Sequence, residues 1–94
     1  MTPEQEERRG EDARQVLENG IYKEAFKQIE ANIVAKMAQA ATKADEAEDL
    51  RKLLIALHRV NQYIRQVATT GTMAAMEQER KRTWMETLKE RYTA

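Results

Sequence analysis

Apolar residues recur in the middle of this chain with the alternating three- and four-residue spacing of a helix that packs against another helix. The members of this stripe are Leu50, Leu53, Leu57, Val60, Ile64 and Val67. Polar residues fill most of the positions between them. The pattern therefore predicts a helix from about residue 46 to residue 69 with an apolar seam on one side.

A second apolar stripe precedes the first and predicts a helix from about residue 21 to residue 41. Its members are Tyr22, Phe26, Ile29, Ile33, Met37 and Ala40. We expect a short turn near residues 42–45 between the two helices; the alternative is one unbroken helix over 21–69. Two helices of matched length, about 30–35 Å each, pair antiparallel when a short turn joins them. Phe26, Ile29 and Ile33 would then face the 50–67 stripe.

The N-terminal segment has the signals of a helix start. Thr2 is suited to an N-cap and Pro3 to the first helical position. A short helix over about 4–18, interrupted at Gly10, and a frayed arm are both compatible with this segment. The Asn19–Gly20 pair predicts a stop or tight turn at its end.

The C-terminal segment is expected to form a separate helix. The run Thr69-Thr70-Gly71 predicts the end of the preceding helix, and a new helix starts at Thr72 and runs towards Tyr92. Its apolar stripe is sparse and Arg80 breaks it. We expect its apolar residues either to bind a partner or to pack on this chain's own hairpin or a sister subunit. They are Trp84, Met85, Leu88 and Tyr92.

These elements predict an all-α protein with three regions. Residues 1–20 form an acidic N-terminal arm or short helix, residues 21–71 an antiparallel helical hairpin, and residues 72–94 an amphipathic partner-binding helix. One hairpin leaves part of its apolar surface in water. We therefore expect hairpins to assemble into a helical bundle, a homo-oligomer in which the chain is its own first partner.

Composition narrows the function classes. Of the 94 residues, 34% are charged, one is proline and three are glycine, which fits a helical chain. The 16 basic and 16 acidic residues balance, so the net charge indicates neither nucleic acid nor an anionic membrane as partner. No apolar run approaches the length of a transmembrane helix or signal sequence. We expect a soluble protein that is not secreted.

Few residues are available for catalysis or metal binding. Cysteine and serine are absent and His58 is the single histidine. Position 55, three residues before His58, is isoleucine, so the Glu-x-x-His motif of di-iron bundles is missing. The glycines are isolated, which excludes phosphate-binding loops. The sequence predicts no catalytic, cofactor-binding or metal-binding residues, and a protein that is not an enzyme.

A basic run near the C-terminus raises one further alternative, DNA binding. Arg80, Lys81, Arg82 and Lys89 lie close to Trp84, and cations beside an aromatic ring can bind a phosphate backbone and stack a base. Four glutamates are interleaved with these cations. The interleaving favours a solvated helix with internal ion pairs, so nucleic acid is the less favoured partner.

Several local patterns resemble a family of small proteins encoded by tailed bacteriophages and prophages near their head and packaging genes. The patterns are RGEDAR at 9–14, LEN at 17–19, AF at 25–26, IE at 29–30 and VATTG at 67–71. The resemblance implies a role in virion assembly or DNA packaging, a larger phage protein such as a portal, capsid or terminase component as partner, and a location in the host cytoplasm or the virion. A small inhibitor of a host complex is the alternative. The chain departs from the family pattern near Met37, where an aromatic residue is expected.

Overall fold

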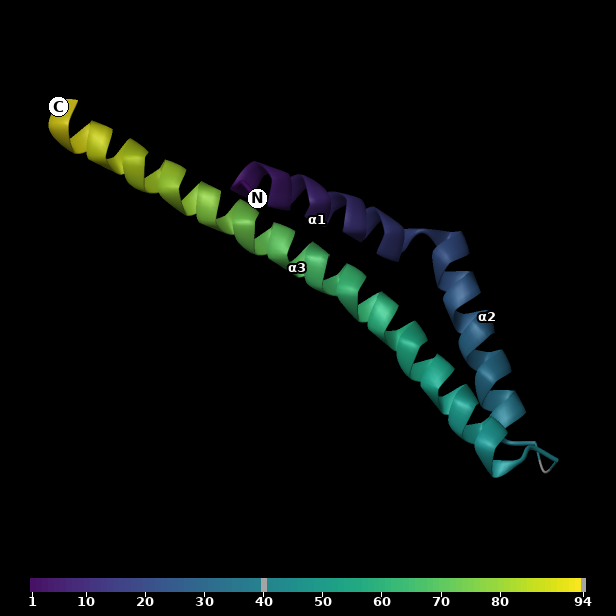
Figure 1. Ribbon diagram of the computed structural model, residues 1–94. Coiled ribbons are helices and arrows are strands. Elements are labelled where there is room, and N and C mark those ends of the chain that lie inside the picture. Colours follow the sequence, from purple (N-terminus) through teal and green to yellow (C-terminus); the bar gives the residue numbers. More distant parts are fainter. Residues whose placement is uncertain (40, 94) are drawn as a thin grey trace.

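Three helices dominate the computed structural model, which describes residues 1–39 and 41–93. They are α1 (Pro3–Glu18), α2 (Gly20–Met37) and α3 (Ala44–Thr93). The first two follow one another along the side of α3, and both run opposite to it (Figure 1). The molecule is a rod of 79 × 24 × 18 Å. The predicted all-α class is confirmed.

The start of α1 is fixed by a capping box. The Thr2 hydroxyl accepts a hydrogen bond from the Gln5 backbone N–H at 3.2 Å, and the Gln5 side-chain carbonyl accepts one from the Thr2 N–H at 2.9 Å. Together these bonds satisfy two donors that a helix start leaves unpaired. The N-cap at Thr2 and the first helical position at Pro3 are confirmed. The segment is helical rather than a frayed arm, and Gly10 does not interrupt it.

Asn19 separates α1 from α2. Its backbone is extended, with φ −65° and ψ 128°, and its side-chain oxygen accepts a hydrogen bond from the Tyr22 N–H at 3.0 Å. Asn19 is therefore the C-cap of one helix and the N-cap of the next. The chain changes direction here, as the Asn19–Gly20 pair predicts (Figure 1).

The second helix ends at Met37, a turn earlier than expected. The Thr42 hydroxyl donates to the Lys36 carbonyl at 2.6 Å and ties the following segment to the helix end. Because α3 begins only at Ala44, the alternative of one helix over 21–69 is wrong. Ala40, the last expected member of the α2 stripe, lies outside the described residues.

α3 is a single helix of 50 residues where the sequence predicted two. The expected stop at residues 69–72 is wrong for a physical reason. The hydroxyls of Thr69 and Thr72 donate to backbone carbonyls one turn earlier, at 3.0 and 3.1 Å, so both side chains are accommodated within the helix. Gly71 is a packing residue rather than a helix end, because α1 lies against it.

The closest packing is between the backbones of α1 and α3. A Cβ atom placed on Gly10 would lie 2.5 Å from the Cα of Gly71. One turn away, Ala13 and Ala74 are both buried. We call Gly10 and Gly71 the glycine contact. No large side chain among the described residues is fully buried, so the interior is thin and is made mainly of small residues at this crossing.

Candidate interaction surfaces

α2 covers one side of the apolar stripe of α3. Two polar contacts mark this crossing: Tyr22 donates from its hydroxyl to the Asn61 side-chain oxygen at 2.8 Å, and His58 lies 2.7 Å from Glu30. Apolar residues of both helices are half-buried along this crossing. They include Phe26 and Ile33 from α2 and Leu50, Leu57 and Ile64 from α3. Val67 lies further along, half-buried beside α1.

The other side of the stripe is open to solvent. Leu53 is 57% exposed and Val60 is 58% exposed, although the sequence placed both in the core. Glu30 and His58 mark the opposite edge of the contact. Ile29 lies about 100° around α2 from Glu30, so it shares the open edge with Leu53 and Val60, and it too is exposed. We call Ile29, Leu53 and Val60 the open strip.

His58 is a surface residue with two neighbours. Its Nε2 lies 2.7 Å from a Glu30 carboxylate oxygen, and its ring meets Phe26 edge-on with centroids 5.5 Å apart. The side chain is 54% exposed, as expected for a partly exposed helix histidine. Within residues 1–39 and 41–93, no three metal-binding side chains come together.

A shallow groove of about 780 Å³ lies on the same side as His58, where α1 gives way to α2. Its floor is apolar and its rim is mostly basic. The lining residues are Leu17, Tyr22, Lys23, Phe26, Lys27, Glu30, Asn61, Arg65, Ala68 and Thr69. The lining includes three cations, Lys23, Lys27 and Arg65, and one carboxylate, Glu30, which already lies against His58. The groove therefore presents positive charge.

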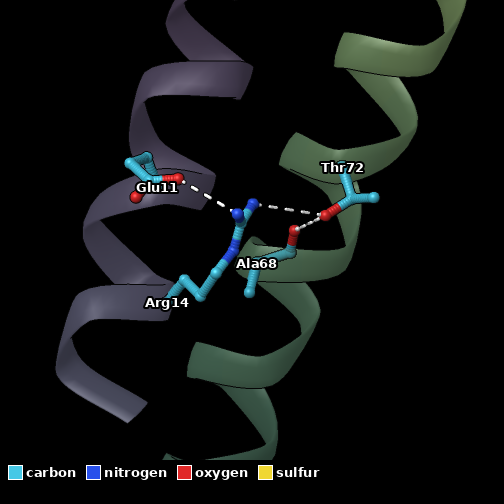
Figure 2. Close-up of polar contacts among 4 residues, drawn as sticks. All are labelled: Glu11, Arg14, Ala68 and Thr72. Atoms are coloured by element: carbon cyan, nitrogen blue, oxygen red, sulfur yellow. Dashed lines mark hydrogen bonds and ion pairs between the residues drawn. The ribbon is translucent and has the colours of Figure 1, made fainter. Parts of the chain in front are cut away.

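Polar contacts flank the glycine contact on both edges. On one edge, Arg14 pairs with Glu11 at 3.2 Å and donates to the Thr72 hydroxyl at 3.5 Å, and Thr72 donates to the Ala68 carbonyl (Figure 2). On the other edge, an Arg9 guanidinium nitrogen donates a hydrogen bond to the Tyr63 hydroxyl at 3.4 Å. The two contacts that join α1 to α3, from Arg14 to Thr72 and from Arg9 to Tyr63, are exposed and are long for hydrogen bonds. Exposed polar contacts contribute little to stability, so we attribute the position of α1 mainly to the close backbone approach at the glycine contact.

The C-terminal part of α3 extends past the start of α1 with no other helix beside it (Figure 1). We call residues 79–93 the free end of α3. Trp84 is 64% exposed, and Met85 and Tyr92 are exposed as well. Leu88 is half-buried. The expected partner-binding residues therefore do not pack on the other helices of the same chain.

The basic run is partly neutralised within its own helix. Arg82 lies 2.6 Å from Glu79, and Arg80 lies 3.6 Å from Glu77. Both pairs span three residues, and all four side chains are exposed. This is the solvated, ion-paired helix face that the interleaved glutamates favour.

The perturbed titratable groups lie at the start of α3. Arg51 donates two hydrogen bonds to the Glu48 carboxylate, at 2.6 and 3.1 Å. These bonds lower the pKa of Glu48 and raise the pKa of Arg51. Both side chains are exposed, so the pair is a surface ion pair rather than an acid–base site.

Comparison with known proteins finds no relative: no family model, no curated protein and no solved structure matches this chain. In the part of the chain that the structure describes, no helix has the length and apolar character needed to cross a membrane.

Sequence reasoning missed the glycine contact. Gly10 was interpreted as an interruption and Gly71 as a stop, because each glycine was considered by itself. A shared spacing could have revealed them: alanine follows three residues later in both helices, at Ala13 and Ala74. Two small residues on one helix face allow another helix to approach closely, and two such pairs in one chain predict a crossing between them.

Proposed function

We propose that this chain is a non-enzymatic interaction protein that self-associates through the open strip and docks on a larger protein through the free end of α3. One observation carries the proposal: three large aliphatic side chains, Ile29, Leu53 and Val60, lie exposed along one edge of a two-helix contact. Exposed apolar residues that lie together on one surface often mark a site of protein–protein contact. A second copy would cover it and complete a helical bundle.

The resemblance to phage proteins provides the biological setting of the proposal. We propose that the assembly acts in phage virion assembly or DNA packaging, and that its larger partner is a structural or packaging component. The exposed Trp84, with its large apolar area, supports a docking role, because tryptophan is enriched at the centres of protein interfaces.

The self-association is tested by sedimentation equilibrium of the full chain. We expect the wild type to exceed the mass of one chain, and the double variant Leu53→Glu, Val60→Glu to form a smaller assembly. Ile55→Glu is the matched control, because Ile55 is also an exposed apolar residue of α3 but points away from the open strip. A monomeric wild type, or equal masses for the wild type and the double variant, contradicts the proposal.

DNA binding through the basic run is the second candidate. The ion pairs of Arg80 and Arg82 with glutamates give it less support. It requires an affinity for duplex DNA that falls steeply with salt concentration, since each phosphate contact releases counterions. Fluorescence anisotropy over a salt series, with Arg80→Glu and Arg82→Glu together as the comparison variant, distinguishes this function from the first.

A further inference from the structure

The middle of α3 carries positive charge that its own helix does not balance. Between Asp49 and Glu77 the sequence has no acidic residue, and Arg65 lies inside this interval, at least three helical turns from either acid. Other arginines of the chain pair with a glutamate three residues before them. They are Arg14, Arg51, Arg80 and Arg82. Arg65 has no acid at that spacing.

Arg65 and two lysines of α2 form the rims of the groove where α1 gives way to α2. Lys23 and Lys27 lie four residues apart, hence on one face of α2, and Arg65 lies across from them on α3. All three residues are exposed, and none forms an ion pair with a described residue. The carboxylate of Glu30 lies 2.7 Å from His58 instead. The groove therefore holds three cations whose charge is not compensated.

The floor between the rims is made of half-buried residues that are mainly apolar. They are Leu17, Tyr22, Phe26 and Ala68. A second hollow of about 360 Å³ shares Asn61 and Arg65 with the groove and reaches His58. From His58 to Thr69 the two hollows follow α3 for about 16 Å at 1.5 Å per residue. This length equals about three turns of a helix.

We propose that the groove binds an acidic amphipathic helix of a partner protein. The apolar face of that helix covers Phe26 and Ala68. Acids four residues apart on one flank meet Lys23 and Lys27, and an acid on the other flank meets Arg65. Recognition of an amphipathic helix by an apolar groove is a recurring mode of binding. The groove lies on the His58 side of α3, away from the open strip, so the inference adds a surface that the proposed function does not use.

The floor favours a protein over a nucleic acid as the occupant. Single strands stack their bases on open aromatic faces. Here both rings are half-buried and engaged: the Tyr22 hydroxyl donates to Asn61, and the Phe26 ring meets His58 edge-on. The floor thus offers apolar area rather than a stacking surface, and apolar area is best covered by aliphatic side chains.

A second copy of this chain fits the groove less well than a different protein. The chain has two acid-rich segments, residues 4–12 and residues 45–49. The first contains no apolar side chain. The second runs into Arg51 and Lys52, which would approach the basic rims. We therefore assign the groove to a helix from another protein.

The first test is fluorescence anisotropy of the full chain with a labelled, designed peptide of about 16 residues, or about four helical turns. One face of the peptide is leucine and both flanks are glutamate. Two matched peptides accompany it: one has lysine in place of glutamate, and one has the same composition in a scrambled order that removes the apolar face. We expect the acidic amphipathic peptide to bind most tightly. Equal affinity for either matched peptide overturns the inference.

Two double variants with the same change in net charge show whether the groove is the binding site. Lys23→Glu with Lys27→Glu reverses one rim, and about a tenfold loss of affinity for the acidic peptide is expected because two attractions become repulsions. Lys52→Glu with Arg59→Glu is the matched control, since both are exposed cations of α3 that do not line the groove. The rim variant should in turn bind the lysine peptide more tightly than the wild type does. Equal losses in the two double variants overturn the inference.

The position of the bound peptide is measured by NMR, from the chemical shifts of the backbone amides. Changes are expected over residues 17–30 and 61–69. Changes confined to the open strip or to the free end of α3 overturn the inference and leave the proposed function standing. A labelled single-stranded DNA is titrated under the same conditions. If it binds more tightly than the acidic peptide and loses its affinity in the rim variant, the groove is a nucleic-acid site and the inference is wrong.

Discussion

Replacing Gly71 by alanine is expected to weaken the attachment of α1 to α3. The added Cβ would lie 2.5 Å from the Cα of Gly10, 2.9 Å from the carbonyl oxygen of Glu6 and 3.1 Å from the Gly10 nitrogen. All three are backbone atoms, so no side-chain rotation can relieve the overlap. Because carbon atoms pack at about 3.5–4.0 Å, α1 has to move outwards by about 1 Å over the whole crossing.

Two opposing terms set the magnitude. Overpacking of this kind costs about 1–3 kcal/mol. Alanine in place of glycine inside a helix returns about 1 kcal/mol through its higher helix propensity. The expected net loss in the free energy of unfolding is about 1 kcal/mol. Gly20→Ala is the matched control, because no atom lies within 4 Å of a Cβ at that position. It is expected to be neutral or slightly stabilising.

The assay is urea denaturation followed by circular dichroism, combined with hydrogen exchange of the α1 amides. Gly71→Ala should lower the unfolding midpoint relative to Gly20→Ala and increase exchange in α1 more than in α2. Equal midpoints and equal exchange in the two variants would refute the close backbone approach, because the steric term would then be absent.

Three further outcomes are expected. Thr2→Ala removes an N-cap and should cost about 0.5–2 kcal/mol, measured by urea denaturation. Leu57→Ala should cost about 1–2 kcal/mol, less than at a fully buried leucine, because Leu57 is only half-buried. Leu53→Ala should cost under about 0.5 kcal/mol, because Leu53 is exposed. Both variants are compared at concentrations where they are monomeric. Hydrogen exchange of the monomer should be fast over residues 80–93 and slow over 64–78, where α1 covers α3.

The local signals predicted the fold class and most helix ends on the N-terminal side. Thr2, Pro3 and Asn19 act through hydrogen bonds and backbone angles of their immediate neighbours, so their roles follow from a few residues of sequence. The connection after Met37 was placed within a few residues for the same reason.

The continuity of α3 could not be predicted in this way. Gly71 is a helix breaker by propensity, and only the approach of α1 accounts for a glycine at that position. The sequence also could not predict that only part of the apolar stripe is covered. Periodicity identifies which face of a helix is apolar, but it does not reveal that a neighbour covers Leu57 and leaves Leu53 and Val60 in water.

The rod shape affects how the protein behaves in solution. A compact domain of 94 residues has a radius of gyration of about 12 Å, whereas this chain has one of 21.5 Å. Such a particle experiences far more friction than a sphere of equal mass. A single chain of 10.9 kDa will therefore elute from a gel-filtration column calibrated with globular standards at the volume of a larger protein, and early elution alone would be mistaken for a dimer.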